Sequence, residues 1–272
     1  MKGISFGQYY PSNSLLHRLD ARIKIILTIL YIVCSFLCDN ILSYAALFLS
    51  AVLLIMIGRV PFRQILRGLR AVLFVIIFTS VLNIFWTRGE QLLFSWTFIS
   101  VYVEGLYAAL FMTIRISTLI IGTGMLLTYT TTPITLTNAI EDLLSPLKLF
   151  GVPVHSFAMM MSIALRFIPT LSEETEKIMT AQKARGADFS SGGLISKAKS
   201  LIPVLIPLFV SAFNRAGDLA TAMECRCYNG DNGRTRMNVR HLKAVDLIPL
   251  VIIVAFGASL IWLNILAIGY TV

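Results

Sequence analysis

Long apolar runs separated by short polar breaks make up most of the first half of the chain, and one more such run lies near its end. A helix that crosses a bilayer needs about 20 mostly apolar residues, and shorter runs suffice when flanking polar side chains reach the interface. The pattern therefore predicts an all-α polytopic membrane protein with about five transmembrane helices, over residues 23–38, 41–58, 71–86, 101–128 and 247–268.

The segment between the fourth and fifth apolar runs has a different pattern, in which charged and apolar positions share the same helices. Turn-forming residues divide it into three predicted helices, over residues 134–144, 154–184 and 194–224. Prolines inside the two long helices should bend them. Each long helix is apolar for much of its length and ends in charged residues, which is typical of helices that lie against or partly in a membrane surface.

These patterns divide the chain into three parts. Residues 1–128 should hold four N-terminal transmembrane helices. Residues 129–245 should form a cytoplasmic region of helices, and residues 246–272 a C-terminal transmembrane helix. A structureless loop of more than a hundred residues would be unusual in a compact protein, so the central part is expected to be helical.

Composition and charge agree with this class of protein. The chain has 272 residues, of which 57% are hydrophobic and 14% charged, whereas a soluble domain is nearer a quarter charged. The formal net charge is +9. In a membrane protein such an excess marks cytoplasmic loops, and no nucleic-acid partner is expected. Thirteen of the 23 Lys and Arg residues lie between Pro133 and Asp246.

A basic loop between the second and third apolar runs sets the expected orientation. It carries Arg59, Arg63, Arg67 and Arg70 without any acidic residue. Such loops stay in the cytoplasm, and three of these arginines share one helical face that would touch lipid phosphates. We therefore expect a multi-pass protein of the cell membrane, with a cytoplasmic N-terminus and the C-terminus outside.

Motifs for catalysis or cofactor binding are absent from the sequence. It contains no G-x-x-x-x-G-K-[ST], no H-E-x-x-H and no G-x-S-x-G, so we expect no nucleotide site, no cofactor and no catalytic residue of these kinds. Cys225 and Cys227 form a single C-x-C pair. Zinc usually takes four ligands, so this pair is a weak signal and no metal site is expected.

Two charged residues lie inside the fourth predicted span. Glu104 and Arg115 are 11 residues apart, which is about three helical turns, so both should lie on one face about 16 Å apart. Charges at this depth normally face protein or a water-filled path. One interpretation is a transport path; the other is that Arg115 fixes packing against a neighbouring element. We favour packing, because a single arginine in mid-span makes no relay.

The most informative pattern is a repeated segment at the ends of the two long central helices. Thr180-Ala181 and Thr221-Ala222 are each followed by an arginine five residues after the threonine. An arginine at a helix C-terminus complements the helix dipole, and a single copy would need no further explanation. Two copies on the two longest central helices favour a functional role, in which each guanidinium fork binds carboxylates of a partner.

At these residues the chain resembles the energy-coupling factor transporter transmembrane component, EcfT, a family related to CbiQ-type proteins. The resemblance covers nearly the whole chain and rests on segments 14–24, 130–133, 164–169 and 181–186. The family hallmark is a pair of Ala-Arg-Gly-like triplets at the ends of coupling helices. Ala184-Arg185-Gly186 matches the first triplet. The second departs from it, because Cys225-Arg226-Cys227 keeps only the arginine, and Asn229-Gly230 could make the turn instead.

The resemblance implies a non-hydrolytic scaffold of an importer for a vitamin or another micronutrient. Its expected partners are two cytoplasmic ABC ATPase subunits, a membrane-embedded substrate-binding component and the lipid bilayer. The two triplets would couple the scaffold to the ATPases. Six further residues are candidates for structural packing: Asp20, Arg22, Glu104, Arg115, Arg166 and Pro169.

Two other functions remain as alternatives. One is a stand-alone membrane permease or intramembrane enzyme centred on Glu104 and Arg115. The other is a membrane-embedded assembly factor without a transport role. Activity of the purified chain by itself would favour the permease or enzyme, whereas copurification with ATPase subunits would favour the scaffold.

Overall fold

The computed structural model describes residues 9–87, 92–96, 99–189, 193–230 and 244–266 of the chain. It consists of two compact units. Of the described residues, those within 9–136 and 244–266 form one unit, called the span unit below, and those within 137–230 form the other, called the central unit. The boundary between them falls within one helix, so each unit is described by itself.

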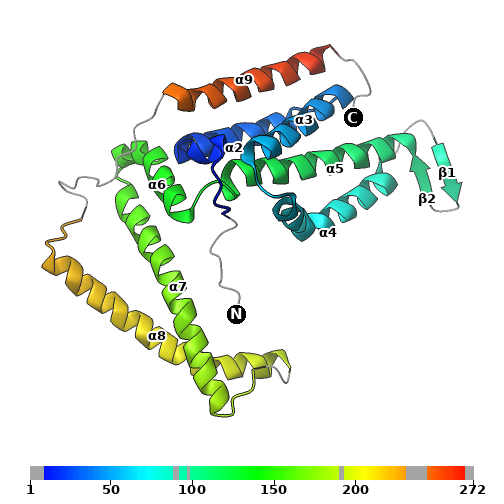
Figure 1. Cartoon of the computed structure of the whole chain (residues 1–272). Coiled ribbons are helices and arrows are strands. Elements are labelled where there is room, and N and C mark those ends of the chain that lie inside the picture. The colour runs from blue at the N-terminus through cyan, green and yellow to red at the C-terminus, as the bar shows by residue number, and fades with distance from the viewer. Residues whose placement is uncertain (1–8, 88–91, 97–98, 190–192, 231–243, 267–272) are drawn as a thin grey trace. The chain divides into compact units, whose positions relative to one another are not determined.

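The span unit consists of helices packed side by side, with a small hairpin (Figure 1). α2 packs against α5 and α9, and α5 also packs against α3 and α4. A five-residue π-helical turn, η1, continues α5, and its Tyr129 N–H donates to the Gly124 carbonyl at 2.8 Å. The bounds are α1 Leu15–Arg18, α2 Ala21–Phe36, α3 Ile41–Gly58, α4 Phe62–Trp86, β1 Leu92–Trp96, β2 Ile99–Tyr102, α5 Val103–Thr123, η1 Gly124–Thr128 and α9 Ala244–Ile265.

Tyr31 on α2 lies at the centre of the apolar core of the span unit. Its side chain is buried together with Leu27 and Leu47, and its hydroxyl lies 3.2 Å from the Ser50 hydroxyl. The ring packs against Gly122 of α5 so closely that a Cβ at this glycine would lie 2.0 Å from the ring carbon Cε1. The absence of a side chain at Gly122 therefore allows α2 and α5 to approach each other.

A polar cluster joins α9 to the connection between α2 and α3. Asn264 donates from Nδ2 to the Leu37 carbonyl at 2.5 Å and accepts from the Ser43 hydroxyl at 2.6 Å. Asn40 donates from Nδ2 to the Leu263 and Asn264 carbonyls, both at 3.4 Å. These contacts provide side-chain donors for carbonyls at the C-terminal ends of two helices, which have no partner within the helix itself.

A buried lysine makes a second long-range tie in the same unit. Lys24 is 2% exposed, and its ammonium donates to the Thr130 carbonyl at 2.9 Å and to the Thr131 hydroxyl at 3.4 Å. Asp20 caps the helix that carries Lys24, because its carboxylate accepts from the Arg22 N–H at 2.9 Å. The start of α2 is thereby fixed to the residues that follow η1.

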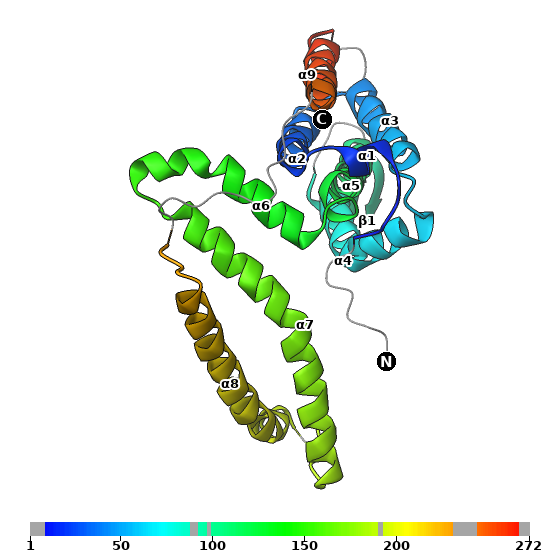
Figure 2. The same ribbon diagram turned by 60° about the vertical axis from the view of Figure 1, so that its left-hand side comes forward.

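The central unit contains two long helices that cross each other (Figures 1 and 2). A hydrogen bond of 2.8 Å from His155 Nδ1 to Glu141 Oε1 connects the start of α7 to α6. Both long helices continue through internal prolines, and in Figure 1 the first turns of α8 run at an angle to the rest of that helix. The bounds are α6 Pro133–Leu143, the 3-10 helix η2 Ser145–Phe150, α7 Val154–Ala184 and α8 Leu194–Cys225.

The multi-pass, helical nature of the chain is confirmed. Among the described residues, six helices are long and apolar enough to cross a membrane: α3, α4, α5 with η1, α7, α8 and α9. The five expected spans included the helix observed as α2, which has only 16 residues and is not in this set. They did not include α7 and α8, which are long and apolar enough to belong to it.

Several element boundaries differ from the sequence-based expectations, most of all the start of the third span. The third span was expected to begin at residue 71, but α4 begins at Phe62, so the arginine-rich loop is largely helical. The connection between α4 and α5 contains an antiparallel hairpin of β1 and β2, and the fourth predicted span, expected from residue 101, begins as a helix at Val103. The return segment 231–243 and the end of the last predicted span lie outside the described residues.

We predict that Gly122→Ala will destabilise the protein. The new methyl group would overlap the Tyr31 ring, and overpacking of this kind costs about 1–3 kcal/mol. The measurement is the thermal unfolding midpoint of the purified chain in detergent.

Gly217→Ala is the matched control. Gly217 lies within α8, and nothing lies within 4 Å of a Cβ added there. Replacing a glycine in an open helical position should raise the free energy of unfolding by about 0.5–1 kcal/mol. Equal unfolding midpoints for Gly122→Ala and the wild type would contradict the close approach of α2 and α5.

Candidate functional site: two arginine tips

The C-terminal end of α7 presents an exposed arginine on a closed helix end. Arg185 is the C-cap residue, and Gly186 follows it with a φ of +88°. The Gly186 N–H donates to the Lys183 carbonyl, and the Ala187 N–H donates to the Gln182 carbonyl, both at 3.0 Å. This pair of bonds is a Schellman motif, which satisfies the last carbonyls of the helix and ends it sharply.

The C-terminal end of α8 repeats this geometry with different residues. Arg226 is the C-cap, and Cys227 occupies the left-handed position with a φ of +55°. The Cys227 N–H donates to the Glu224 carbonyl at 2.9 Å, and the Tyr228 N–H donates to the Met223 carbonyl at 3.1 Å. Cys227 therefore does what Gly186 does in α7, and the expectation that Asn229-Gly230 could close this helix is wrong.

The likeness of the two ends, called the arginine tips below, begins before the arginines. Thr180 and Thr221 each donate from the side-chain hydroxyl to a carbonyl four residues earlier, at 2.8 and 3.0 Å. Their hydroxyls are therefore engaged within their own helices. The positions one and four residues after each threonine carry small, exposed side chains: Ala181, Ala184, Ala222 and Cys225. A partner can approach the helix backbone closely along such a face.

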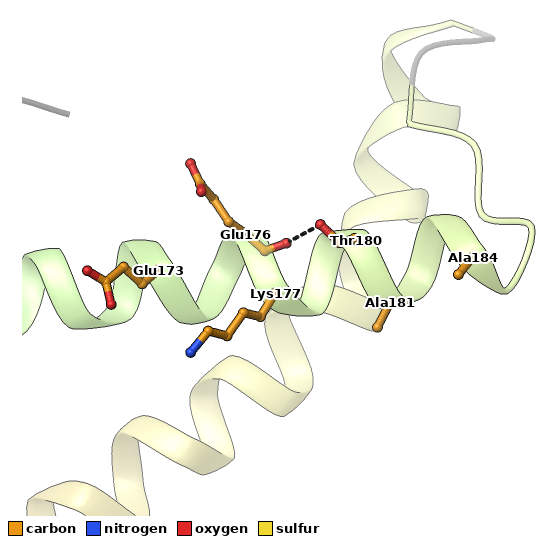
Figure 3. Close-up of a pocket in the computed structure, with 6 residues that line it drawn as sticks. All are labelled: Glu173, Glu176, Lys177, Thr180, Ala181 and Ala184. Carbon is orange, nitrogen blue, oxygen red and sulfur yellow. Dashed lines mark hydrogen bonds between the residues drawn. The ribbon is translucent and has the colours of Figure 1, made fainter. Parts of the chain in front are cut away.

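A surface hollow leads to the tip of α7. It is lined by Glu173, Glu176, Lys177, Thr180, Ala181 and Ala184. Figure 3 shows Lys177, Ala181 and Ala184 on the same side of the helix. The small alanines form the part of the hollow next to Arg185, and the charged residues form the part farther from the tip.

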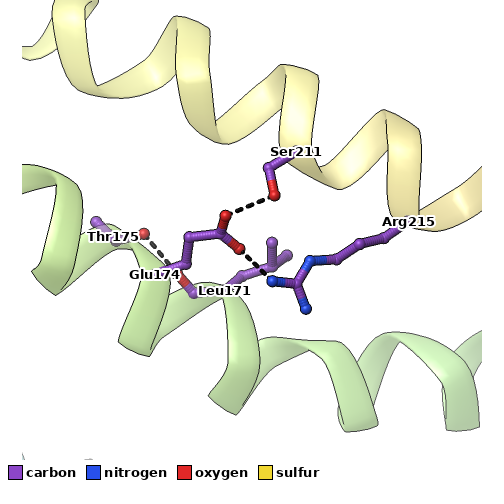
Figure 4. A network of polar contacts seen from close by, with 5 residues as sticks. All are labelled: Leu171, Glu174, Thr175, Ser211 and Arg215. Carbon is purple, nitrogen blue, oxygen red and sulfur yellow. Dashed lines mark hydrogen bonds and ion pairs between the residues drawn. The ribbon is translucent and has the colours of Figure 1, made fainter.

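A polar contact links α7 and α8 where they cross (Figure 4). Glu174 accepts from the Ser211 hydroxyl at 2.5 Å and from Arg215 Nη2 at 2.7 Å. The Glu174 side chain is 22% exposed and the Arg215 side chain 40% exposed. Both carboxylate oxygens thus bind the same face of α8, which specifies the register of the crossing more than a single bond would.

The structure does not bring Glu104 and Arg115 together. Arg115 donates from Nη2 to the Cys38 carbonyl at 2.7 Å and to the Tyr44 hydroxyl, and its guanidinium lies 5.3 Å from the centroid of the Tyr44 ring. Glu104 lies in the first turn of α5, where an acidic residue favours the positive end of the helix dipole. Arg115 thus ties α5 to the connection between α2 and α3.

The remaining packing candidates are divided between the two units. Asp20 is buried and Arg22 half-buried at the start of α2, where their side chains lie 4.0 Å apart. Arg166 and Pro169 are exposed on α7. Sequence reasoning missed the buried Lys24, and the only available signal was a lysine within an otherwise apolar helix pattern.

Comparisons with known proteins agree with this architecture. The model of the family described as cobalt transport protein, CbiQ, matches residues 12–237. A protein of Ruminiclostridium cellulolyticum named energy-coupling factor transporter transmembrane protein EcfT is 52% identical over 256 residues, which is 94% of this chain and 95% of that protein. The EcfT protein of Bacillus subtilis is 44% identical over 264 residues, or 97% and 99% of the two chains.

The chain belongs to the CbiQ/EcfT family. The region that matches the family model includes α2 to α5 and both arginine tips.

We predict different effects of replacing the left-handed residue in each of the two tips. Cys227→Gly should stabilise the end of α8 or leave it unchanged, because a non-glycine residue in this conformation costs about 1–2 kcal/mol and a glycine loses about 0.5–1 kcal/mol more entropy on folding. Gly186→Ala should destabilise the end of α7 by about 1 kcal/mol. Amide hydrogen exchange at residues 180–187 and 221–228 measures both effects.

The cause of the Gly186→Ala effect would be backbone conformation alone, because nothing lies within 4 Å of a Cβ added at this position. Gly193→Ala serves as the control, since Gly193 is equally open and has a negative φ of −74°. Faster exchange after Cys227→Gly than in the wild type would contradict the left-handed closure of α8.

We also predict that Arg115→Met will lower stability by about 1–3 kcal/mol, because the Cys38 carbonyl would lose its side-chain donor. Tyr44→Phe should cost less, because the carbonyl bond remains. The double variant should cost less than the sum of the two, since both single changes remove the same contact. Thermal unfolding in detergent measures these differences, and strict additivity would contradict the contact.

Proposed function

We propose that this chain is the transmembrane scaffold of an importer of the energy-coupling factor type. It would join two cytoplasmic ABC ATPase subunits to a membrane-embedded subunit that binds a vitamin or another micronutrient. The observation that carries the proposal is the repeated arginine tip, in which the same backbone closure presents Arg185 and Arg226 at the ends of two helices. The names of the relatives support membership in such a transporter.

Each arginine tip would dock in an acidic groove of one ATPase subunit. Arg185 and Arg226 are exposed, and a guanidinium presents several donors in a fixed plane that matches a carboxylate. The small residues before each arginine allow a groove to close around the helix end. Two tips of equal geometry suit two ATPase subunits of similar structure.

The scaffold would have no enzymatic activity of its own. Its sequence has no nucleotide-binding loop, so the ATP-binding surfaces would belong to its partners. The chain would instead transmit movement. When ATP draws the ATPase subunits together the tips would be displaced, and the contact of Glu174 with Ser211 and Arg215 would couple the movement of one long helix to the other.

The substrate-binding subunit would lie against apolar surfaces of the long helices. Large apolar side chains are exposed on both of them, including Phe157, Met160, Phe209 and Phe213. Such side chains are normally covered by lipid or by another protein. Displacement of the helices beneath that subunit would tilt it and open its binding site to the cytoplasm, and the substrate would be determined by that subunit.

The protein is a multi-pass membrane protein, and we propose that its N-terminus is cytoplasmic and its C-terminus outside. This orientation places the basic segment around Arg59–Arg70 and both arginine tips in the cytoplasm, as the positive-inside rule requires. It also exposes the tips to the compartment that holds ATP.

We predict that Arg185→Glu and Arg226→Glu will each weaken binding of the ATPase subunits by about 30-fold or more. Loss of one partner of a buried charge pair at an interface costs about 2–5 kcal/mol, and reversal of the charge adds repulsion. The measurement is the dissociation constant of the purified ATPase pair for the scaffold in nanodiscs.

Lys199→Glu is the control, since it reverses an exposed charge near the start of α8, far along the helix from its tip. This variant should bind the ATPases as the wild type does. Unchanged binding and transport in both arginine variants would refute the proposed role of the tips, and catalytic turnover by the isolated scaffold would refute the non-enzymatic role.

A further inference from the structure

Four arginines lie exposed at the corner between α3 and α4, and neither the proposed docking of the ATPases nor the arrangement of the core uses them. They are Arg59, Arg63, Arg67 and Arg70. Residues 59–70 contain no Asp or Glu. Among the residues that the structure describes, the ion pairs do not involve any of these four arginines. The positive charge of this corner is therefore available to an external anion.

The corner is held rigidly by apolar residues beneath it. Val60 is 5% exposed and Ile65 is 2% exposed, and both pack with Met125 and Tyr129. Arg59 itself takes a left-handed conformation with a φ of +50°, between Gly58 and Val60, which are both buried. Because the inner face of the corner is fixed in the core, its arginine face points outward without needing a partner to order it.

Apolar side chains accompany the arginines on the outer face. Phe62 is 67% exposed and Leu66 is 49% exposed. After Arg70 the helix continues for 16 residues without any charge, from Ala71 to Trp86. A surface that combines exposed cations with exposed apolar groups, at the start of an apolar span, matches the boundary between headgroups and acyl chains.

The length of α4 agrees with this depth. Its 25 residues correspond to about 37 Å at 1.5 Å per residue, whereas the hydrocarbon core of a bilayer is about 30 Å thick. The difference of about 7 Å corresponds to about five residues, so Phe62 to Leu66 extend into the headgroup layer, and the long side chains of Arg67 and Arg70 reach that layer from the adjoining turns. At that depth the available anions are lipid phosphates.

We propose that Arg59, Arg63, Arg67 and Arg70 form a binding site for the headgroups of anionic phospholipids. The opposite charges attract, Phe62 and Leu66 insert beside the acyl chains, and the fixed corner keeps the guanidinium groups in place without further ordering. The site goes beyond the proposed transport function and is independent of the arginine tips. Arg63 and Arg67, at i and i+4, repel each other until an anion binds.

The test is titration of delipidated full-length protein with phosphatidylglycerol and, separately, with phosphatidylcholine, with bound lipids counted by native mass spectrometry. Arg63→Gln/Arg67→Gln should weaken phosphatidylglycerol binding roughly 30-fold, because each basic residue near an anionic membrane surface contributes about fivefold. Phosphatidylcholine binding should not change. Arg59→Gln/Arg70→Gln is a second, independent pair that should lose phosphatidylglycerol in the same way.

Lys197→Gln/Lys199→Gln is the control for net charge, because it removes two exposed cations from α8 and should leave phosphatidylglycerol binding intact. In nanodiscs of phosphatidylcholine alone, the arginine variants should unfold no earlier than the wild type. Unchanged phosphatidylglycerol binding in both arginine pairs, or an equal loss in the lysine control, would overturn the proposal. So would full displacement of the lipid by inorganic phosphate or by the purified ATPase pair.

Discussion

The carbonyl groups at helix ends are the constraint on which the span unit depends. In a bilayer there is no water to accept or donate hydrogen bonds, so a backbone group without a partner costs several kcal/mol. Here the donors come from side chains of other helices. Arg115 reaches the Cys38 carbonyl, Asn264 reaches Leu37, and Lys24 reaches Thr130. Each bond provides a donor for a carbonyl at or just after the end of one element. It also holds the helix that carries the donor against that end.

These bonds explain why charged and amide residues occur among apolar helices. Lys24, at 2% exposed, is buried as deeply as Tyr31, yet it stays compatible with the core because its ammonium has carbonyl and hydroxyl partners. Asn40, which precedes α3, donates to two carbonyls at the end of α9. Asn264 of α9 donates in turn to the Leu37 carbonyl at the end of α2. Specific polar contacts thus determine the register of helices that apolar packing alone would leave free to slide.

The sequence predicted the long helices of the central unit well, because turn-forming residues mark their ends. The expected bounds of α7, 154–184, agree with the structure, and those of α8 differ by one residue. The start of α4 was missed because arginines between apolar runs are typical of loops, although arginine is a good helix former. The hairpin of β1 and β2 was missed because its segment, expected to be a loop between two spans, is short and apolar, so periodicity could not separate strand from loop.

The candidate site was predictable in its residues and not in its geometry. The two arginines were evident from the repeated Thr-Ala lead, whereas the left-handed conformation of Cys227 had no signal in the sequence, because glycine is the residue usually found there. The partner of Arg115 was likewise hidden, since Cys38 contributes a backbone carbonyl, which every residue has. Contacts to the backbone leave no trace in side-chain patterns.

The π-helical turn η1 has a consequence for the helix that follows it. Five residues close a wider ring than an α-helix does, so the turn holds one residue more than the same length of regular helix. Removing one residue from Gly124–Thr128 would restore the regular winding and leave the residues after it facing almost as before. Removing one residue from the regular part of α5 would instead rotate everything after it by about 100°, the angle between successive residues of an α-helix. Thr130 and Thr131 would then face away from Lys24. The π turn therefore accommodates one extra residue while Thr130 and Thr131 keep facing Lys24.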